Sequence, residues 1–61
     1  MNRIVKILMN RDGLDESEAK ALVNDVREMM LEAIDNGDYA EAEEIMESEL
    51  GIELDYIIDI L

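Results

Sequence analysis

Apolar residues recur along this chain at steps of three and four, the spacing that is typical of one face of an amphipathic helix. The pattern is most regular at Ala19, Leu22, Val23, Val26, Met29, Met30, Ala33 and Ile34. Asp15 stands just before it as a suitable N-cap, and Glu18 follows at the position that completes a capping box. These residues predict a long helix over residues 16–36.

Three glycines divide the rest of the chain: Gly13, Gly37 and Gly51. Each follows a helical pattern, and glycine is the residue that most readily takes the left-handed conformation that ends helices. The segments between the glycines predict further helices over about 2–12, 39–50 and 53–61. Asp38 is expected to cap the 39–50 helix, with Glu41 at the capping-box position.

The last segment is rich in isoleucine, which also favours strands. Asp55 and Asp59 lie four residues apart among apolar neighbours, and this spacing favours an amphipathic helix instead. The connections between segments are short, so consecutive helices must fold back or cross sharply. The predicted fold class is therefore all-α: a compact bundle of three or four helices that forms a single domain over residues 1–61.

Composition narrows the chemistry that this bundle can support. The chain has 61 residues, of which 49% are hydrophobic, and it contains neither cysteine nor histidine. Disulfides and thiolate sites are thereby excluded, and the commonest neutral metal ligand and general base are missing. A core of this size gives only marginal stability, and self-association is the remaining way to support it.

The hydroxyl and carboxylate groups do not form a recognisable active site. Ser17 and Ser48 are flanked by glutamates on faces that are expected to be exposed. Carboxylate pairs such as Glu43 and Glu47 could screen a divalent cation, but the loop at 35–38 has its glycine in the wrong position for a selective calcium site. We therefore predict no enzyme activity, no catalytic residue, no metal site and no cofactor.

Charge is distributed unevenly along the chain, whose formal net charge is −12. Of its 17 carboxylates, all but that of Asp12 follow residue 14, whereas Arg3, Lys6 and Arg11 precede it. We expect this basic opening helix to lie against the acidic remainder, because three cations are too few for a nucleic-acid site. Direct nucleic-acid binding is not expected. No apolar run reaches the length of a membrane span, and the expected location is cytoplasmic.

The terminal segments contain more apolar residues than a bundle of this size is expected to bury by itself. Large exposed apolar patches mark interfaces, so a homodimer formed through the two ends of the chain is predicted. The expected interface residues are Ile4, Leu8, Leu54, Ile57, Ile58 and Leu61. Leu31 lies off the apolar face of its helix and is a secondary candidate.

The outer face of the 39–50 helix is nearly all carboxylate. The predicted contact residues on it are Glu41, Glu43, Glu44 and Glu47. Such a face can be a solvated surface that keeps a small protein soluble. It can also mimic nucleic-acid phosphate and occupy a basic groove on a nucleic-acid-handling protein, with electrostatic attraction speeding the association. The sequence leaves both interpretations open.

Part of the chain resembles a pattern in other small proteins. The residues that carry the resemblance are GDYAEAEEIM at 37–46, Leu-Gly-Ile at 50–52, Asp-Tyr at 55–56 and Val-Arg-Glu at 26–28. They resemble short helical proteins of unassigned function from Gram-positive bacteria and from their phages or mobile elements. The resemblance covers most of the chain, implies a small helical protein, and carries over no catalytic residues.

A shorter likeness is to ribbon-helix-helix antitoxins, in which a Gly-Asp-Tyr turn also precedes a helix. The arginines usual in that helix are replaced here by Glu43, Glu44 and Glu47, and no DNA-reading strand precedes the long helix. The leading prediction is a homo-oligomeric protein–protein interaction module. The first alternative is an acidic inhibitor whose partner has a basic surface, and the second is an antitoxin-like regulator.

Overall fold

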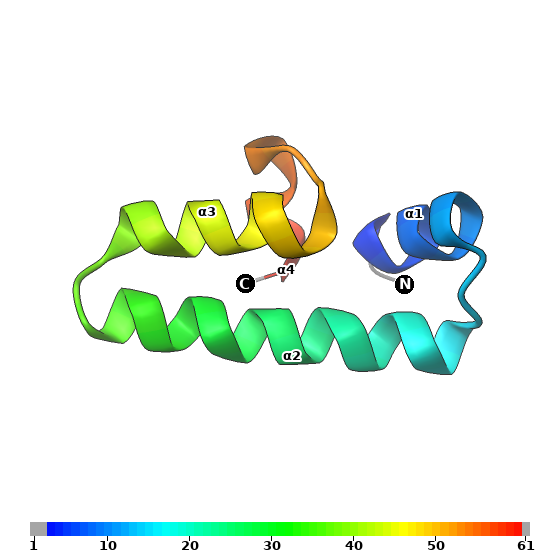
Figure 1. Ribbon diagram of the computed structural model, residues 1–61, viewed down its shortest axis with the longest axis horizontal. Coiled ribbons are helices and arrows are strands. Elements are labelled where there is room, and N and C mark those ends of the chain that lie inside the picture. The colour runs from blue at the N-terminus through cyan, green and yellow to red at the C-terminus, as the bar shows by residue number, and fades with distance from the viewer. Residues whose placement is uncertain (1–2, 61) are drawn as a thin grey trace.

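Helices account for nearly all of the described chain. The structure, a computed structural model, describes residues 3–60 apart from the side chain of Leu54. In chain order its elements are α1 (Arg3–Asp12), α2 (Glu16–Asp35), α3 (Tyr39–Leu50), the 3-10 turn η1 (Leu54–Tyr56) and α4 (Ile57–Ile60) (Figure 1). The described residues form no strand, and the all-α prediction is confirmed. The predicted first residue of the opening helix and last residue of the final one lie outside the described part.

The start of α2 has the capping box that its sequence predicts. The Asp15 side chain accepts a hydrogen bond from the Glu18 amide at 2.8 Å, and the Asp15 amide donates to Glu18 Oε1 at 3.3 Å. One turn further on, Lys20 and Glu16 form an ion pair at 2.8 Å on the solvent side. These local contacts explain why α2 begins where the sequence pattern says it should.

The turn between α2 and α3 ends one helix and begins the next. Gly37 has a φ of 79°, a left-handed conformation that costs glycine little. This geometry lets the Gly37 amide donate to the Ile34 carbonyl and the Asp38 amide donate to the Ala33 carbonyl, both at 2.9 Å, as in a Schellman motif. Asp38 then caps α3 by accepting from the Glu41 amide at 3.0 Å. The two helices therefore run antiparallel as a hairpin (Figure 1).

A single apolar core lies between α2 and the other helices. Its largest fully enclosed side chains are Ile4, Leu8, Val26, Met30, Met46, Leu50 and Ile60. Among the described residues no polar or charged side chain is buried. Since a fully buried aliphatic side chain stabilises the fold by about 1.5–3 kcal/mol, this core is the main support of the bundle.

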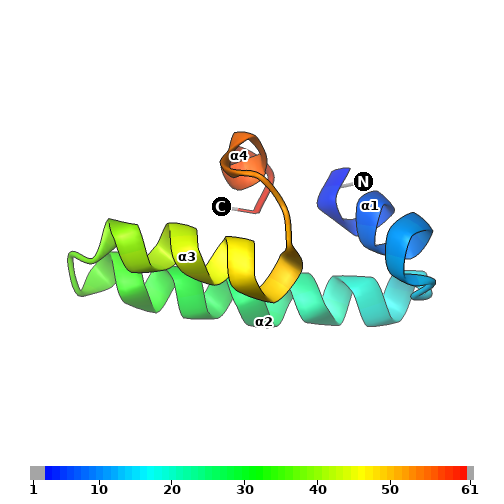
Figure 2. The same ribbon diagram turned by 45° about the horizontal axis from the view of Figure 1, so that its top comes forward.

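The terminal segments contribute to this core, contrary to the expectation that they leave a large apolar face exposed. Ile4 and Leu8 have no exposed surface at all. The reason is topological: α1 folds back across α2, and the C-terminal segment lies beside both α1 and the end of α3 (Figures 1 and 2). The two ends of the chain therefore cover each other's apolar side chains within one molecule.

The C-terminal segment differs from the single helix predicted over 53–61. It consists of the η1 turn followed by one turn of α-helix. Ile60 is buried and Ile57 half-buried, whereas Ile58 is 83% exposed. A segment this short is too costly to nucleate as an independent helix, so its conformation follows from packing Ile52 and Ile60 into the core.

Candidate interaction surface

The predicted acidic contact residues are all exposed, but they do not share a single side of α3. The residues are Glu41, Glu43, Glu44 and Glu47. Because an α-helix turns by about 100° per residue, Glu43 and Glu47 lie on one side of α3 and Glu41 lies on the other, with Glu44 between them on the outer surface. The acidic face is therefore divided between two sides that have different neighbours.

On the Glu41 side, a groove of about 270 Å³ runs between α2 and α3. It is lined by Met29, Glu32, Ala33, Asn36, Glu41 and Ile45. Met29 remains 40% exposed and Ile45 is half-buried, so apolar surface is open to solvent inside the groove. Glu32 stands on α2 and Glu41 on α3, which places one carboxylate on each of the two helices that form the groove.

The charged residues that flank this groove are acidic throughout the described part of the hairpin. On α2, Asp25 shares the side of Met29 because it lies four residues before it. On α3, Glu49 shares the side of Ile45 for the same reason. Both carboxylates are exposed. The negative potential of Glu32 and Glu41 therefore continues along the groove in both directions.

The opposite side of α2 has a mixed charge. Lys20 and Arg27 lie seven residues apart there, and Leu31 follows four residues later, so the three share one side of the helix. Leu31, the secondary interface candidate of the sequence, is 40% exposed, the same fraction as Met29. A hollow beside Leu31 is also lined by Glu32 and Asp35, so this side differs from the Met29 side by the added presence of Lys20 and Arg27 and not by a lack of carboxylates.

The predicted dimer interface is not assembled as one exposed surface. Ile4 and Leu8 are in the core, so they are not accessible to a partner in the folded chain. Ile57 is half-buried and Ile58 exposed. The side chain of Leu54 and the whole of Leu61 lie outside the described part.

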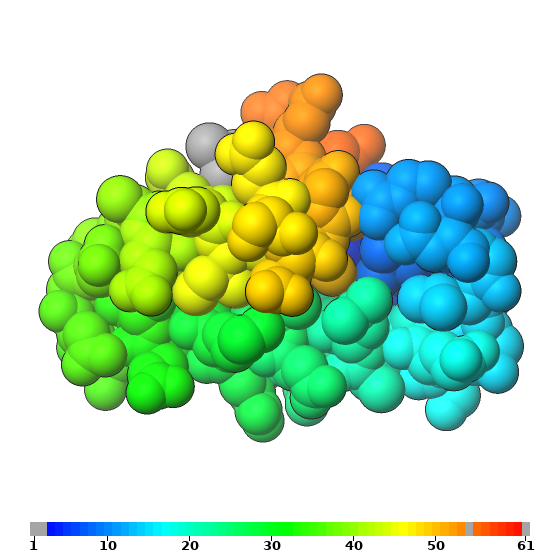
Figure 3. All heavy atoms as spheres, viewed as in Figure 1, coloured from blue at the N-terminus to red at the C-terminus, as the bar shows by residue number. Residues whose placement is uncertain are grey.

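The arginines of α1 contact the C-terminal part of the chain. Arg3 forms an ion pair with Asp59 at 2.5 Å, and its guanidinium lies 4.7 Å from the centre of the Tyr56 ring. Hydrogen bonding to Asp59 raises the pKa of Arg3 above its ordinary value. Figure 3 shows α1 in blue directly against the yellow and orange end of α3 and the segment that follows it. The basic helix α1 therefore lies against the acidic remainder, as expected. Its contacts are with the C-terminal end of the chain and not with the glutamates of α3.

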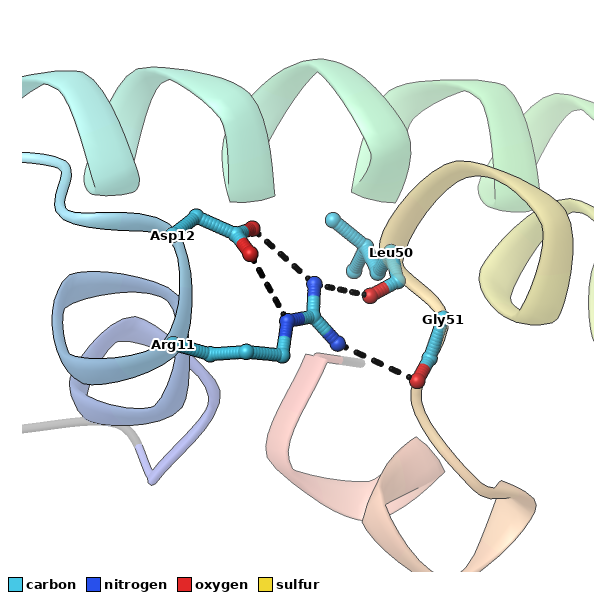
Figure 4. A network of polar contacts seen from close by, with 4 residues as sticks. All are labelled: Arg11, Asp12, Leu50 and Gly51. Carbon is cyan, nitrogen blue, oxygen red and sulfur yellow. Dashed lines mark hydrogen bonds and ion pairs between the residues drawn. The ribbon is translucent and has the colours of Figure 1, made fainter.

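Arg11 connects three parts of the chain (Figure 4). Its guanidinium donates to the Leu50 carbonyl at 2.6 Å and to the Gly51 carbonyl at 3.2 Å, and it pairs with both carboxylate oxygens of Asp12 at 2.8 and 3.0 Å. The hydrogen bonds between Arg11 and Asp12 lower the pKa of Asp12 and raise that of Arg11. A cation at a helix C-terminus also interacts favourably with the helix dipole, so Arg11 acts as a C-cap for α3.

Sequence reasoning did not identify the groove or the Arg11 cap. Helical spacing predicts an inward position for Met29, but the structure places it, like Ile45 of α3, at the edge of the buried face of its helix. The available signal was the carboxylate four residues from each of them, Asp25 and Glu41. Arg11 gave no comparable signal, because its acceptors lie 39 and 40 residues away in sequence.

Three comparisons, with protein families, with curated proteins and with solved structures, give no match to this chain. Within residues 3–60, no helix is long and apolar enough to cross a membrane. Over the same residues, no cluster of three or more carboxylates has the arrangement of a metal site. The features that define the candidate surface are therefore its shape, its exposed apolar side chains and its charge.

Proposed function

We propose that this protein is a non-enzymatic interaction module that binds a partner with a basic surface through the outer side of the α2–α3 hairpin. The observation that carries the proposal is the exposure of every predicted contact glutamate on α3. The burial of Ile4 and Leu8 in the core also favours this function over self-association through the terminal helices. The first alternative of the sequence thus becomes the leading one.

Electrostatics supply the mechanism. A chain with a formal charge of −12 attracts a cationic surface over a distance of about 10 Å at 0.1 M salt, which speeds encounter and orients the partner. Because the backbone of α3 is already ordered as a helix, pairing of its carboxylates with lysine or arginine has to order side chains only. A basic groove that normally binds nucleic-acid phosphate has the matching charge, so a nucleic-acid-handling protein is the partner class that we propose. We place this interaction in the cytoplasm.

The test is capture of a basic partner at two salt concentrations. Immobilised protein is compared with the variant Glu41→Gln/Glu43→Gln/Glu44→Gln/Glu47→Gln in lysate of the source cells, at about 50 mM and about 300 mM salt. We expect capture of a nucleic-acid-binding protein by the native chain at low salt, with loss at high salt and with the variant. Capture that is unaffected by both changes would contradict the proposal.

A second candidate function is homodimerisation through the C-terminal segment. It is favoured by Ile58, which is 83% exposed on α4 beside the half-buried Ile57. Sedimentation at high protein concentration tests it, with Ile58→Glu as the variant that introduces a charge at the centre of the surface. A native chain that sediments as a monomer would exclude this function.

A further inference from the structure

We propose that the groove between α2 and α3 is the docking site for a basic amphipathic helix of the partner protein, which seats an apolar side chain between Met29 and Ile45. This inference rests on the proposed function and narrows it to one side of the hairpin. Within the acidic face it assigns binding to Glu41 together with Glu32 of α2, and it assigns no contact to Glu43 or Glu47.

The groove offers apolar surface that the chain itself leaves open. Met29 is 40% exposed and Ile45 half-buried, with Ala33 buried beneath them. The C-terminal segment lies beside the end of α3 (Figures 1 and 2). Glu47, on the side of α3 away from Glu41, lines a separate hollow together with residues 51–53. A third helix laid along the Met29 side would complete the hairpin as a three-helix arrangement, with side chains packed into the grooves of their neighbours.

The dimensions suit a short helix. α3 has 12 residues and so a length of about 18 Å, which bounds the groove at about three helical turns. A helix of that length presents one or two large apolar side chains to the hairpin. Its flanking positions then face Glu32 on one side and Glu41 on the other.

Charge complementarity selects a basic occupant. Lysine or arginine on both sides of the apolar anchor would pair with Glu32 and Glu41, and Asp25 and Glu49 extend the same field along the helices. A second copy of this chain would bring like charges together on this side, and nucleic acid would meet carboxylates with phosphates. Both therefore fit the groove worse than a cationic helix does.

The probe is a synthetic leucine–lysine peptide of about 14 residues, with its leucines on one helical face. A scrambled peptide of the same composition carries the same charge without an apolar face. Binding is followed by fluorescence anisotropy at about 50 mM salt, where charge attraction is weakly screened. We expect the amphipathic peptide to bind at least fivefold more tightly than the scrambled one, because only it can fill the groove.

Matched variants locate the site on one side of the hairpin. Met29→Gln should weaken binding of the amphipathic peptide by about tenfold, whereas Leu31→Gln, at a position of equal exposure, should change it by less than about twofold. Glu32→Gln/Glu41→Gln should weaken it about fivefold, and Glu43→Gln/Glu47→Gln, which removes the same charge, should have a much smaller effect. Circular dichroism confirms that each variant remains helical.

Three outcomes would overturn the inference, and they differ in what they imply for the proposed function. Equal binding of the two peptides, or equal losses from the two double variants, would show general charge attraction, which leaves the proposed function intact. A loss with Leu31→Gln that matches the loss with Met29→Gln would place the site on the other side of α2. No binding by either peptide would overturn the inference, whereas the proposed function would still be decided by the capture experiment.

Discussion

The guanidinium of Arg11 donates a hydrogen bond to the main-chain carbonyl of Leu50 at 2.6 Å, which joins the last turn of α1 to the last turn of α3. Helix C-termini leave carbonyls without partners inside the helix, and here a side chain from a different helix supplies the donor. Asp12 holds the guanidinium in place from the other side. A polar contact thus fixes the C-terminal ends of the two helices relative to each other.

Replacing Arg11 tests this capping role. Arg11→Met retains much of the aliphatic length but removes the donors to Leu50 and Gly51, so we expect the melting temperature to fall by about 5 °C. Lys6→Met removes the same charge from an exposed position of α1 and should have a clearly smaller effect. Thermal denaturation followed by circular dichroism measures both, and equal shifts would mean that only the charge of α1 matters.

Gly51 is expected to be less tolerant of alanine than Gly37. Both have positive φ, 61° and 79°, so alanine costs about 1–2 kcal/mol at either position. A Cβ atom at Gly51 would also lie 3.3 Å from Nη1 of Arg11, whereas one at Gly37 would meet nothing within 4 Å. Urea denaturation should therefore show a larger loss for Gly51→Ala. In an Arg11→Met background the difference between the two glycines should disappear.

Truncation of Leu8 tests whether α1 belongs to the core of the single chain. Replacing a fully buried leucine by alanine lowers the free energy of unfolding by about 2–5 kcal/mol. This loss is comparable to the whole stability of a domain this small. We expect Leu8→Ala to be largely unfolded and Ile58→Ala to be nearly unchanged. The milder Ile4→Val should cost about 0.5–1.5 kcal/mol and keep the effect measurable. A fully stable Leu8→Ala would contradict the packing of α1 on α2.

The contact between Arg11 and Asp12 predicts a pH dependence. Hydrogen bonding by the guanidinium lowers the pKa of Asp12 in the folded protein below its ordinary value of 3.8. The folded state therefore favours the ionised carboxylate more than the unfolded chain does. The resulting stabilisation is complete above the unfolded pKa and is lost as the pH falls through the lower folded pKa.

Comparison of Asp12→Asn with the native chain at several pH values measures this stabilisation. We expect the native chain to be the more stable at pH 7 and the difference to shrink as the pH falls below 3.8 and through the lower pKa of Asp12 in the folded protein. Asp25→Asn is the control, since it removes an equal charge from an exposed position of α2. A difference between native and Asp12→Asn proteins that persists unchanged in acid would rule out the charged contact as its cause.

Much of the secondary structure could be predicted because its signals are local. The capping box joins Asp15 to Glu18, only three residues along the chain. The positive φ of Gly37 is a property of a single residue and its immediate neighbours. The C-terminal segment could not be predicted as well, because the short stretch around Ile60 takes its conformation from the core that it covers. Its isoleucines alone do not show which of them faces inward.

The candidate site divides in the same way. The helical period of α3 explains why its predicted contact glutamates are exposed, since the apolar residues between them must face the core. These glutamates are Glu41, Glu43, Glu44 and Glu47. The structure places Glu41 beside Met29 and Glu47 on the side of the C-terminal segment. This arrangement depends on how α3 is rotated against α2.

The sequence by itself determined the first three helices, their ends and their inner faces, because capping and amphipathic spacing act over a few residues. Only the tertiary structure decided that Ile4 and Leu8 are enclosed within one chain and that Arg11 caps a helix 39 residues away. It also decided that Met29 of α2 and Ile45 of α3 line one groove together with Glu32 and Glu41. The physical reason is that each of these features requires two helices to meet at a particular rotation, and that rotation is set by the packing of the whole core.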